Sequence, residues 1–481
     1  MRPALLSGIA IVIAVCAFQL WISPGNPPGF FRDEAALAYN AYTIEHSGRD
    51  EYGARFPLYF SSFLDYKSPI FVYVLAGVFR VTGPTREVAR GLAAVSMLAA
   101  VLLLGWLAFR LTGRTAVGVA ATALAGFSPW LFELGRVAFE VSLEPFLLVV
   151  VLLGVARAAR VDDWRPIGAL PVALGLGAIT YVYAGGRFLA PLLAVALLVL
   201  LDRRRWRWVA TAVGGFAVTQ VPLLLYSQAH PGALSRRLDA TSFIHHGTSP
   251  FEIVWRTLFN YVQDLQLWTY VVSGDKKPYA HTPGTSMLLA ASVALSLAGL
   301  VIVARERRAE PFWRFALATL LVSPLPAAIT IDRFHAVRLA PFAVMLVVFA
   351  IPAIAAIRST ALAAAVVVAG AVQFALFVHD WSTDGPLRTG RFEAGIPVLL
   401  QRAWRDGGTV YVDYDDLEPL TLARWYALDH GVPETRVVRL PDGGVPPTGA
   451  TAFGRTQPCD YRCTRVAESG DYWLARVDGP R

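Results

Sequence analysis

An acidic pair, Asp33 and Glu34, directly follows the first hydrophobic segment of the chain, and Lys67 opens a second apolar run further along. Carboxylates near hydrocarbon lose hydration, so an acidic pair beside a membrane exit is costly unless it has a role. We interpret Asp33, with Glu34 beside it, as a catalytic base at the bilayer surface and Lys67 as a partner for a lipid phosphate. The structural alternative is that both carboxylates only begin an interfacial helix, whose N-terminus favours negative charge.

More ionisable residues gather at the ends of later apolar segments. Glu140 and Glu144 are four residues apart and therefore share one helical face. With Arg136 they could hold a cation, orient an acceptor or form a structural ion-pair network, and these alternatives stay open. Glu133 is expected to face lipid headgroups.

Two further clusters carry cations at segment ends. Tyr183 and Arg187 flank a Gly-Gly turn, and Arg187 either faces an external cavity or snorkels to a headgroup. Arg338 begins a span and could hold a phosphate by a bidentate contact. His335 is as compatible with a structural role as with a ligand role. Convergence of these groups on one leaflet would indicate an active site for an anionic, lipid-linked substrate.

The elements that position these residues belong to a membrane protein. Of the 481 residues, 55% are hydrophobic and 16% are charged, against roughly 25% charged in soluble domains. The net charge of +8 does not indicate a nucleic-acid partner, because arginines cluster at the ends of apolar segments, as the positive-inside rule predicts.

Eleven segments are candidate membrane spans, since a span needs about 20 mostly apolar residues. They are 4–22, 88–109, 115–132, 141–156, 166–183, 187–201, 208–226, 285–303, 315–331, 339–357 and 359–378. The first has no cleavage site behind it and is expected to be retained. The apolar run 68–79 is too short to cross and is predicted to lie in the interface or to re-enter it. With the N-terminus inside, fourteen arginines fall in cytoplasmic connections and four in the short external ones.

This topology places two long loops, about residues 23–87 and 227–284, and the C-terminal tail outside. The loop 227–284 holds Trp255, Tyr261, Trp268 and Tyr270, which suit an interfacial helix. In the tail, 409–412 and 437–440 are typical of strands and 417–429 of an amphipathic helix. Cys459 and Cys463 fit a short disulfide if that end is outside the cytoplasm.

The predicted fold class is therefore mainly α. Residues 1–380 are expected to form a polytopic transmembrane helical bundle of about eleven spans, with interfacial helices in the first external loop and in a later one. Residues 381–481 are expected to form a small external α/β domain.

Known soluble-enzyme motifs are missing from the sequence. It contains no Walker loop, no dinucleotide glycine signature after a strand, no His-Glu-x-x-His and no Gly-x-Ser-x-Gly. We therefore expect no site for ATP or a nucleotide-activated donor. Three rival functions remain: a lipid-linked sugar transporter or flippase, which should carry charges near the bilayer midplane and inverted repeats, an envelope polysaccharide polymerase or ligase, and a non-catalytic scaffold.

The motifs resemble those of the polytopic GT-C glycosyltransferases, in the branch of the protein O-mannosyltransferases and the lipid A aminoarabinose transferases. The first two matches at their spacing are the specific ones, and the layout matches over residues 1–380. The matching pieces are Arg32-Asp33-Glu34-Ala35, Lys67-Ser68-Pro69, Ser128-Pro129 to Gly135-Arg136 with Leu143-Glu144-Pro145, and Arg338-Leu339-Ala340-Pro341.

The resemblance implies a hexosyl- or pentosyltransferase that takes a monosaccharide from a polyprenyl-phosphate donor to a lipid, polysaccharide or protein acceptor. In that scheme Asp33 deprotonates the acceptor hydroxyl, attack inverts the anomeric carbon, and Lys67, Arg338 and Arg187 stabilise the leaving phosphate. It also implies a bacterial plasma-membrane protein with an extracytoplasmic active site and C-terminal domain. No cofactor is certain, a divalent metal is possible, and either Glu140 or Glu144 is the site acid, of which Glu144 fits better.

Overall fold

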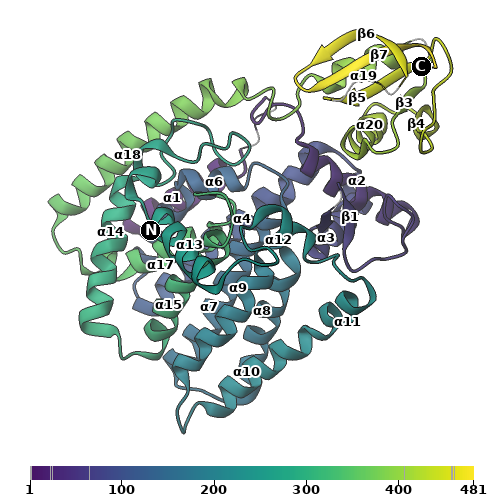
Figure 1. The fold of residues 1–481 in the computed structure, drawn as a ribbon. Coiled ribbons are helices and arrows are strands. Elements are labelled where there is room, and N and C mark those ends of the chain that lie inside the picture. Colours follow the sequence, from purple (N-terminus) through teal and green to yellow (C-terminus); the bar gives the residue numbers. More distant parts are fainter. Residues whose placement is uncertain are drawn as a thin grey trace. The chain divides into compact units, whose positions relative to one another are not determined.

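The computed structural model describes residues 3–21, 23, 25–63, 65–405, 407–456, 459 and 461–480. The chain is mainly helical and divides into two compact units (Figure 1). We call them the helical unit and the mixed unit. The helical unit comprises Met1–Trp21, Ser68–Phe71 and Arg90–Trp381, and the mixed unit comprises Ile22–Lys67, Val72–Ala89 and Ser382–Arg481.

All eleven segments that were predicted as spans fall on helices, although residue 22 at the end of the first lies outside the described residues. The predicted spans correspond to α1 Pro3–Gln19, α4 Arg86–Thr112, α5 Thr115–Gly126 with α6 Pro129–Leu134, α7 Glu144–Val161, α8 Leu170–Val182, α9 Gly186–Ala196, α10 Trp206–Thr219 with α11 Val221–Ala229, α14 Ala290–Ile302, α15 Pro311–Val322 with α16 Leu325–Ala328, α17 Ala340–Ala356 and α18 Thr360–Thr383.

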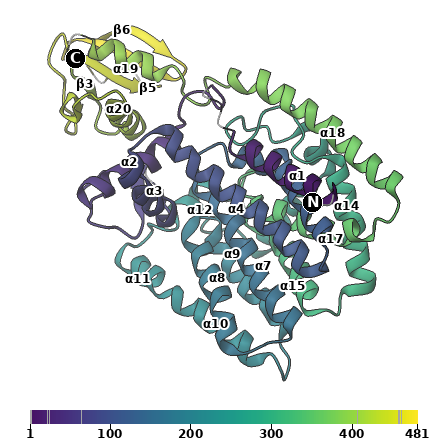
Figure 2. The ribbon, with the colours of Figure 1, turned by 180° about the vertical axis from the view of Figure 1, so that it is seen from behind.

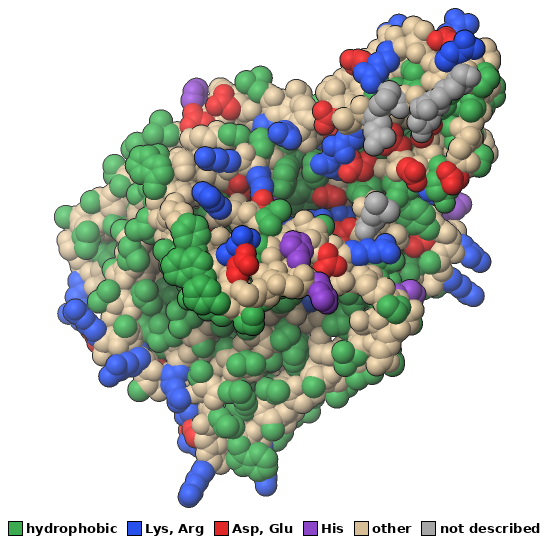
Figure 3. All heavy atoms as spheres, in the orientation of Figure 1, with side chains coloured by type: hydrophobic (Ala, Val, Ile, Leu, Met, Phe, Trp, Pro, Cys, Tyr) green, Lys and Arg blue, Asp and Glu red, His purple; other side chains and the backbone are tan. Residues whose placement is uncertain are grey.

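The helical unit has the character of a multi-pass membrane protein. Among the described residues, four helices are long and apolar enough to cross a membrane, and six further apolar helices are shorter. The four are Arg86–Thr112, Glu140–Val161, Trp206–Ala229 and Thr360–Leu387. In Figure 3, hydrophobic side chains cover broad areas of this unit, and lysine and arginine side chains gather at its lower end. The count of eleven spans and the orientation of the chain remain predictions.

Neighbouring helices of this unit pack closely, with α7, α8, α9 and α10 side by side and α14 against α17 (Figures 1 and 2). Because lipid is as apolar as leucine, such packing depends on close van der Waals contact and on small residues at the crossings. Gly299 of α14 is one of these, since a Cβ there would overlap the carbonyl of Phe349 on α17. The close crossing therefore requires glycine.

The predicted interfacial helix of the long loop is α13, Pro250–Asp264, which begins where the Ser249 side chain accepts a hydrogen bond from the Glu252 N–H at 3.1 Å. Trp255 on its outer face is 60% exposed. Tyr270 was predicted to share this surface, and that prediction is wrong. It is buried, and its hydroxyl donates to the Asp264 carbonyl, because a buried phenol needs a partner.

The short apolar run after Lys67 forms helix α3, Pro69–Thr82. At 1.5 Å per residue its 14 residues span roughly 21 Å, against about 30 Å of hydrocarbon. This length fits the prediction that the run does not cross the membrane.

The mixed unit is built on a five-stranded sheet and helix α2, Arg32–Ser47. The sheet order is β4-β3-β5-β7-β6, in which β3 pairs in parallel with β4 and β5, and β7 pairs antiparallel with β5 and β6. Helices α19 and α20 accompany the sheet, and a hairpin of β1 and β2 completes the unit. The bounds are β1 Phe60–Ser62, β2 Asp65–Lys67, α19 Ile396–Trp404, β3 Val410–Val412, α20 Leu417–Asp429, β4 Val437–Arg439, β5 Thr451–Arg455, β6 Arg462–Ser469 and β7 Tyr472–Gly479.

The predicted strand–helix–strand order of the tail is confirmed as β3, α20 and β4. The predicted disulfide between Cys459 and Cys463 is also present. Helix α2 of the first long loop packs against α20, so the loop and the C-terminal segment belong to one unit. That 381–481 is a domain of its own remains a prediction.

Candidate active site

The ion pair between Asp33 and Lys67 lies in the mixed unit. Asp33 is in the first turn of α2 and Lys67 ends β2, and 2.8 Å separates the Lys67 Nζ from the Asp33 Oδ1. Pairing of β1 with β2 sets Lys67 opposite Phe60 and holds the lysine side chain in a buried position. The Asp33 side chain remains 29% exposed. A partly open carboxylate with a buried counter-ion can accept a proton from a bound hydroxyl.

Glu34 has a different role in the same turn. Its carboxylate accepts the Phe31 N–H at 3.0 Å, which satisfies one of the free donors at the start of α2. The residue is fully buried. Glu34 therefore has the structural role of beginning helix α2, as the alternative prediction stated. A catalytic role for Glu34 remains a prediction.

The residue after Lys67 belongs to the helical unit. There the Ser68 N–H donates to the carboxylate of Glu140, which lies just before α7. Glu144 is buried in the first turn of α7. The contact with Ser68 is a reason to propose Glu140 as the site acid, whereas the motif favoured Glu144.

Arg136 is buried between the ends of two helices. Its guanidinium donates to the carbonyls of Trp21, at 2.7 Å, and Gln19, and it lies 4.6 Å from the centre of the Phe132 ring. The last carbonyls of a helix lack partners within the helix and carry partial negative charge, so a cation stabilises them. Arg136 therefore closes the end of α1, and its predicted part in substrate binding remains a prediction.

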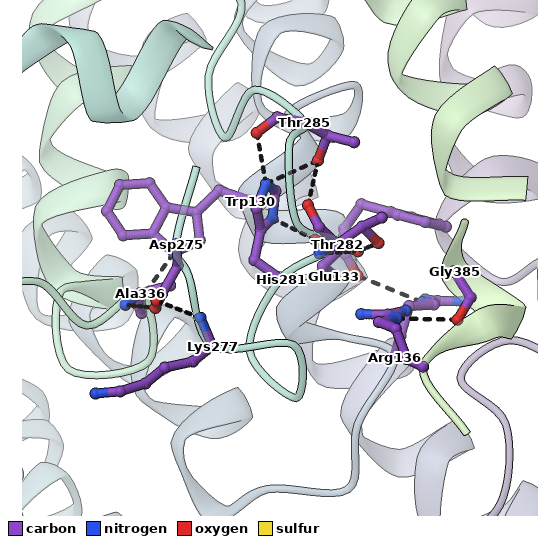
Figure 4. A network of polar contacts seen from close by, with 12 residues as sticks. Trp130, Glu133, Arg136, Asp275, Lys277, His281, Thr282, Thr285, Ala336 and Gly385 are labelled. Carbon is purple, nitrogen blue, oxygen red and sulfur yellow. Dashed lines mark hydrogen bonds and ion pairs between the residues drawn. The ribbon is translucent and has the colours of Figure 1, made fainter. Parts of the chain in front are cut away.

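Glu133 was expected to face headgroups, and this prediction is wrong. Its carboxylate is buried, accepts the Thr282 N–H at 2.9 and 3.0 Å and the Thr282 hydroxyl, and forms an ion pair with His281 (Figure 4). The His281 Nε2 lies 3.0 Å from the Thr285 carbonyl. A buried carboxylate must be paired, and a loop whose Thr282 lies 149 residues further along the chain supplies these partners.

Burial alone would lower the pKa of His281, but the charge and hydrogen bond of Glu133 outweigh it and raise the pKa above its ordinary value. The Glu133 carboxylate and the protonated form of His281 thus stabilise each other inside the helical unit. Their contact anchors the loop 275–285.

A second charged cluster lies at the start of the same loop and before α17. The two oxygens of Asp332 each contact one cation: Oδ2 lies 2.7 Å from the Arg338 guanidinium, and Oδ1 contacts the Lys277 ammonium. Arg338 also donates to the Thr330 hydroxyl at 2.8 Å. Burial raises the pKa of Asp332, but the Lys277 hydrogen bond and the Arg338 charge bring it below its ordinary value. One carboxylate therefore holds two cations together.

Backbone contacts fix the position of Lys277. Asp275 accepts the Lys277 N–H at 2.9 Å through Oδ1 and the Ala336 N–H at 2.7 Å through Oδ2, as Figure 4 shows. This carboxylate ties the loop 275–285 to the segment before α17.

His335 is neutral in this cluster. Burial, and the charges of Arg338, Lys277 and Arg237, lower its pKa well below the ordinary value. Its Nε2 lies 3.2 Å from the Tyr279 hydroxyl, which is close enough for a hydrogen bond. A neutral imidazole can orient Tyr279 but adds no positive charge for a phosphate.

The remaining predicted residues lie at the start of α9. Tyr183 directly follows the last residue of α8. The Arg187 guanidinium is half-buried and donates to the Leu234 carbonyl at 3.1 Å. Arg187 therefore holds a protein group in the structure, and its expected role with a phosphate remains a prediction.

Lys277 and Tyr279 were missed by sequence reasoning, although a signal existed. The sequence contains only three lysines, at positions 67, 276 and 277, whereas its other cations are arginines. Lys67 was predicted to be a site residue, whereas Lys276 and Lys277 were not. As for metals, no group of three or more His, Cys, Asp or Glu is placed to hold an ion within the part of the chain that the structure describes. Metal dependence stays open.

Neither a protein-family model nor a curated protein sequence matches the chain. Solved structures do match. ArnT from Cupriavidus metallidurans bound to undecaprenyl phosphate gives a TM-score of 0.61 at 14% identity, over 99% of both chains. The oligosaccharyltransferase of Archaeoglobus fulgidus in the apo form gives 0.53 at 12% identity, over 88% of this chain and 64% of that one. The complex of that archaeal enzyme, AglB, with an inhibitory peptide and a dolichol-phosphate also gives 0.53, at 11% identity, over 89% and 64%.

These likenesses define the fold. The chain is a multi-pass membrane protein with the fold of the polytopic GT-C glycosyltransferases, as its motifs indicated. Its likeness to ArnT extends over the whole chain, including the C-terminal segment for which no motif was available.

Proposed function

We propose that this protein transfers a monosaccharide from a polyprenyl-phosphate donor to an acceptor hydroxyl, on the extracytoplasmic face of a bacterial plasma membrane. The observation that carries the proposal is the ion pair of Asp33 and Lys67 at the start of α2. The likeness of the whole chain to an ArnT structure bound to undecaprenyl phosphate supports the choice of donor.

In the proposed reaction Asp33 accepts the proton of the acceptor hydroxyl. The hydroxyl oxygen forms a bond to the anomeric carbon while the bond from that carbon to the phosphate oxygen breaks. Attack from the opposite side inverts the anomeric carbon, and polyprenyl phosphate leaves with the electron pair. A positioned base of this kind accelerates a reaction by about 10²- to 10⁴-fold.

Lys67 has two partners in this proposal. Without donor it pairs with Asp33 at 2.8 Å. When the donor binds, the ammonium turns to the phosphate, which frees the carboxylate to accept the proton and stabilises the charge that develops on the leaving group. The buried position of Lys67 strengthens this interaction, because water screens it less.

A second candidate phosphate site lies within the helical unit, at Lys277 and Arg338. Asp332 already holds these two cations with its two oxygens, much as a phosphate would hold them with two of its own. We propose that this pair can bind a phosphate group, with Tyr279 oriented by His335 beside it. Glu140 is the proposed site acid in place of Glu144, because of its contact with Ser68.

The test is sugar transfer in membranes from a radiolabelled polyprenyl-phosphate monosaccharide, comparing wild type with Asp33→Asn and Lys67→Ala. Asp163→Asn is a matched control, since this carboxylate pairs with nearby Arg165 on the surface. We expect transfer by wild type and by the control, and its loss in Asp33→Asn at equal expression. Donor that moves between leaflets without product, whatever residue is at position 33, would instead mean that the protein is a transporter.

A further inference from the structure

Arg32, the residue before the proposed base, lies between two carboxylates of the C-terminal segment 382–481. Its Nη1 is 3.1 Å from the Glu418 Oε2 and 3.7 Å from the Glu393 Oε1. Glu418 also pairs with Arg455, and Glu393 accepts the Tyr472 hydroxyl at 3.0 Å. The first turn of α2 is thus tied to α20 and to the sheet of the mixed unit.

The same segment holds the loop that leads into α2. Gly29 has a φ of +65°, and a Cβ there would overlap the backbone of Phe392 and Ala394. The Arg388 guanidinium donates to the Asn26 Oδ1 at 2.9 Å. Two backbones in such close contact leave the loop little freedom, so the starting point of α2 is set by residues 388–394.

Contacts continue along α2 and beyond its end. The Tyr39 hydroxyl donates to Glu434, and Glu51 accepts hydrogen bonds from Asn40 at 3.0 Å and from Thr421 at 2.9 Å. Glu393 is buried, which raises its pKa to about 7. A helix held at its start, middle and end cannot rotate without breaking several polar contacts.

We infer that the C-terminal segment is a positioning element for the reaction, and that Glu418 and Glu393 orient the Asp33 carboxylate through Arg32. This inference rests on the proposed role of Asp33 as the base. Arg32 and the two glutamates touch no reacting atom in this scheme. They set the rotation of the first turn of α2, and a misplacement of about 1 Å can cost roughly 10²-fold in rate.

The test measures kcat and the donor KM of full-length Arg32→Ala, together with hydrogen exchange of the amides at 30–36. We expect kcat to fall about 10- to 100-fold with the donor KM nearly unchanged, and faster exchange at 30–36. The conservative variant Arg32→Lys keeps the positive charge between the two carboxylates and should retain more of kcat than Arg32→Ala. Arg439→Ala is the control, since that side chain binds the Tyr414 carbonyl within the C-terminal segment.

The outcomes separate this inference from the proposed function. If Asp33→Asn is inactive while Arg32→Ala keeps its kcat, the positioning role is overturned and the base remains. If Asp33→Asn keeps full activity, the proposed function fails, and exchange at 30–36 then decides whether the segment holds α2. Unchanged exchange in Arg32→Ala would overturn the inference by itself.

Discussion

Replacing Glu133 by glutamine tests whether the buried pair with His281 anchors the loop 275–285. The substitution keeps the size of the side chain and removes its charge, so the ion pair with His281 is lost and the hydrogen bonds from Thr282 become weaker. Breaking a buried ion pair by changing one partner costs about 3–5 kcal/mol. Because about 1.4 kcal/mol corresponds to a factor of ten, the loop should open about 10²- to 4 × 10³-fold more often.

Hydrogen exchange of peptides from the loop measures this opening directly, because exchange from local openings reports their free energy. Glu310→Gln is the matched control, since its carboxylate pairs with Arg307 at the surface and should contribute little. We expect fast exchange at 275–285 in Glu133→Gln and wild-type exchange in the control. A change below tenfold in Glu133→Gln would refute the anchoring role.

The same pair predicts the sign of a pH effect. The pKa of His281 is raised in the folded protein, so its stabilisation is complete below the unfolded value of about 6.5 and is lost as the pH rises through the folded value. Wild-type loop opening, corrected for intrinsic exchange, should therefore increase with pH. Glu133→Gln should flatten this dependence, and an unchanged slope in the variant would contradict the pairing.

Three further predictions follow from the sites described above. Lys277→Ala should lower kcat/KM for the donor by about 10- to 100-fold, whereas replacing the exposed Lys276 by alanine should leave it unchanged. Steady-state kinetics of the two variants test this, and equal kcat/KM values would contradict a role for Lys277. Cys463→Ser should destabilise the mixed unit by about 2 kcal/mol, since the closed loop is short, and denaturation with and without reductant measures this. Burial raises the pKa of Glu393 to about 7 from 4.5, so the free energy of unfolding should fall as the pH rises between these values. If Glu393→Gln shows the same pH dependence of the free energy of unfolding as wild type, this prediction is wrong.

The helices of this protein were predictable because their signal is local. Hydropathy over about 20 residues marks a helix that must satisfy its own backbone in lipid, and every predicted span falls on a helix. The strand at 409–412 and the helix at 417–429 were predictable for a similar reason, from alternation and helical periodicity within a few residues. The number of spans is harder to predict, because several of these helices are shorter than a bilayer is thick.

The partners of the charged residues were harder to predict. Glu133 looked like a surface residue at a span end, but a distant loop covers it and supplies His281 and Thr282. Arg136 was predicted to bind substrate, which remains a prediction, and its partners in the structure are the carbonyls at the end of α1. In both cases the residue type was noticed, and its partner depends on which segments far apart in the sequence come together.

The sequence by itself predicted a helical membrane protein, with Asp33 and Glu34 after the first apolar segment and Lys67 before a short apolar run, because composition and spacing are properties of the chain. Only the tertiary structure decided that Lys67 pairs with Asp33, that Glu34 caps α2, and that Lys277 joins Arg338 through Asp332. Ion pairs act over a few ångströms, and folding determines which side chains come within that distance.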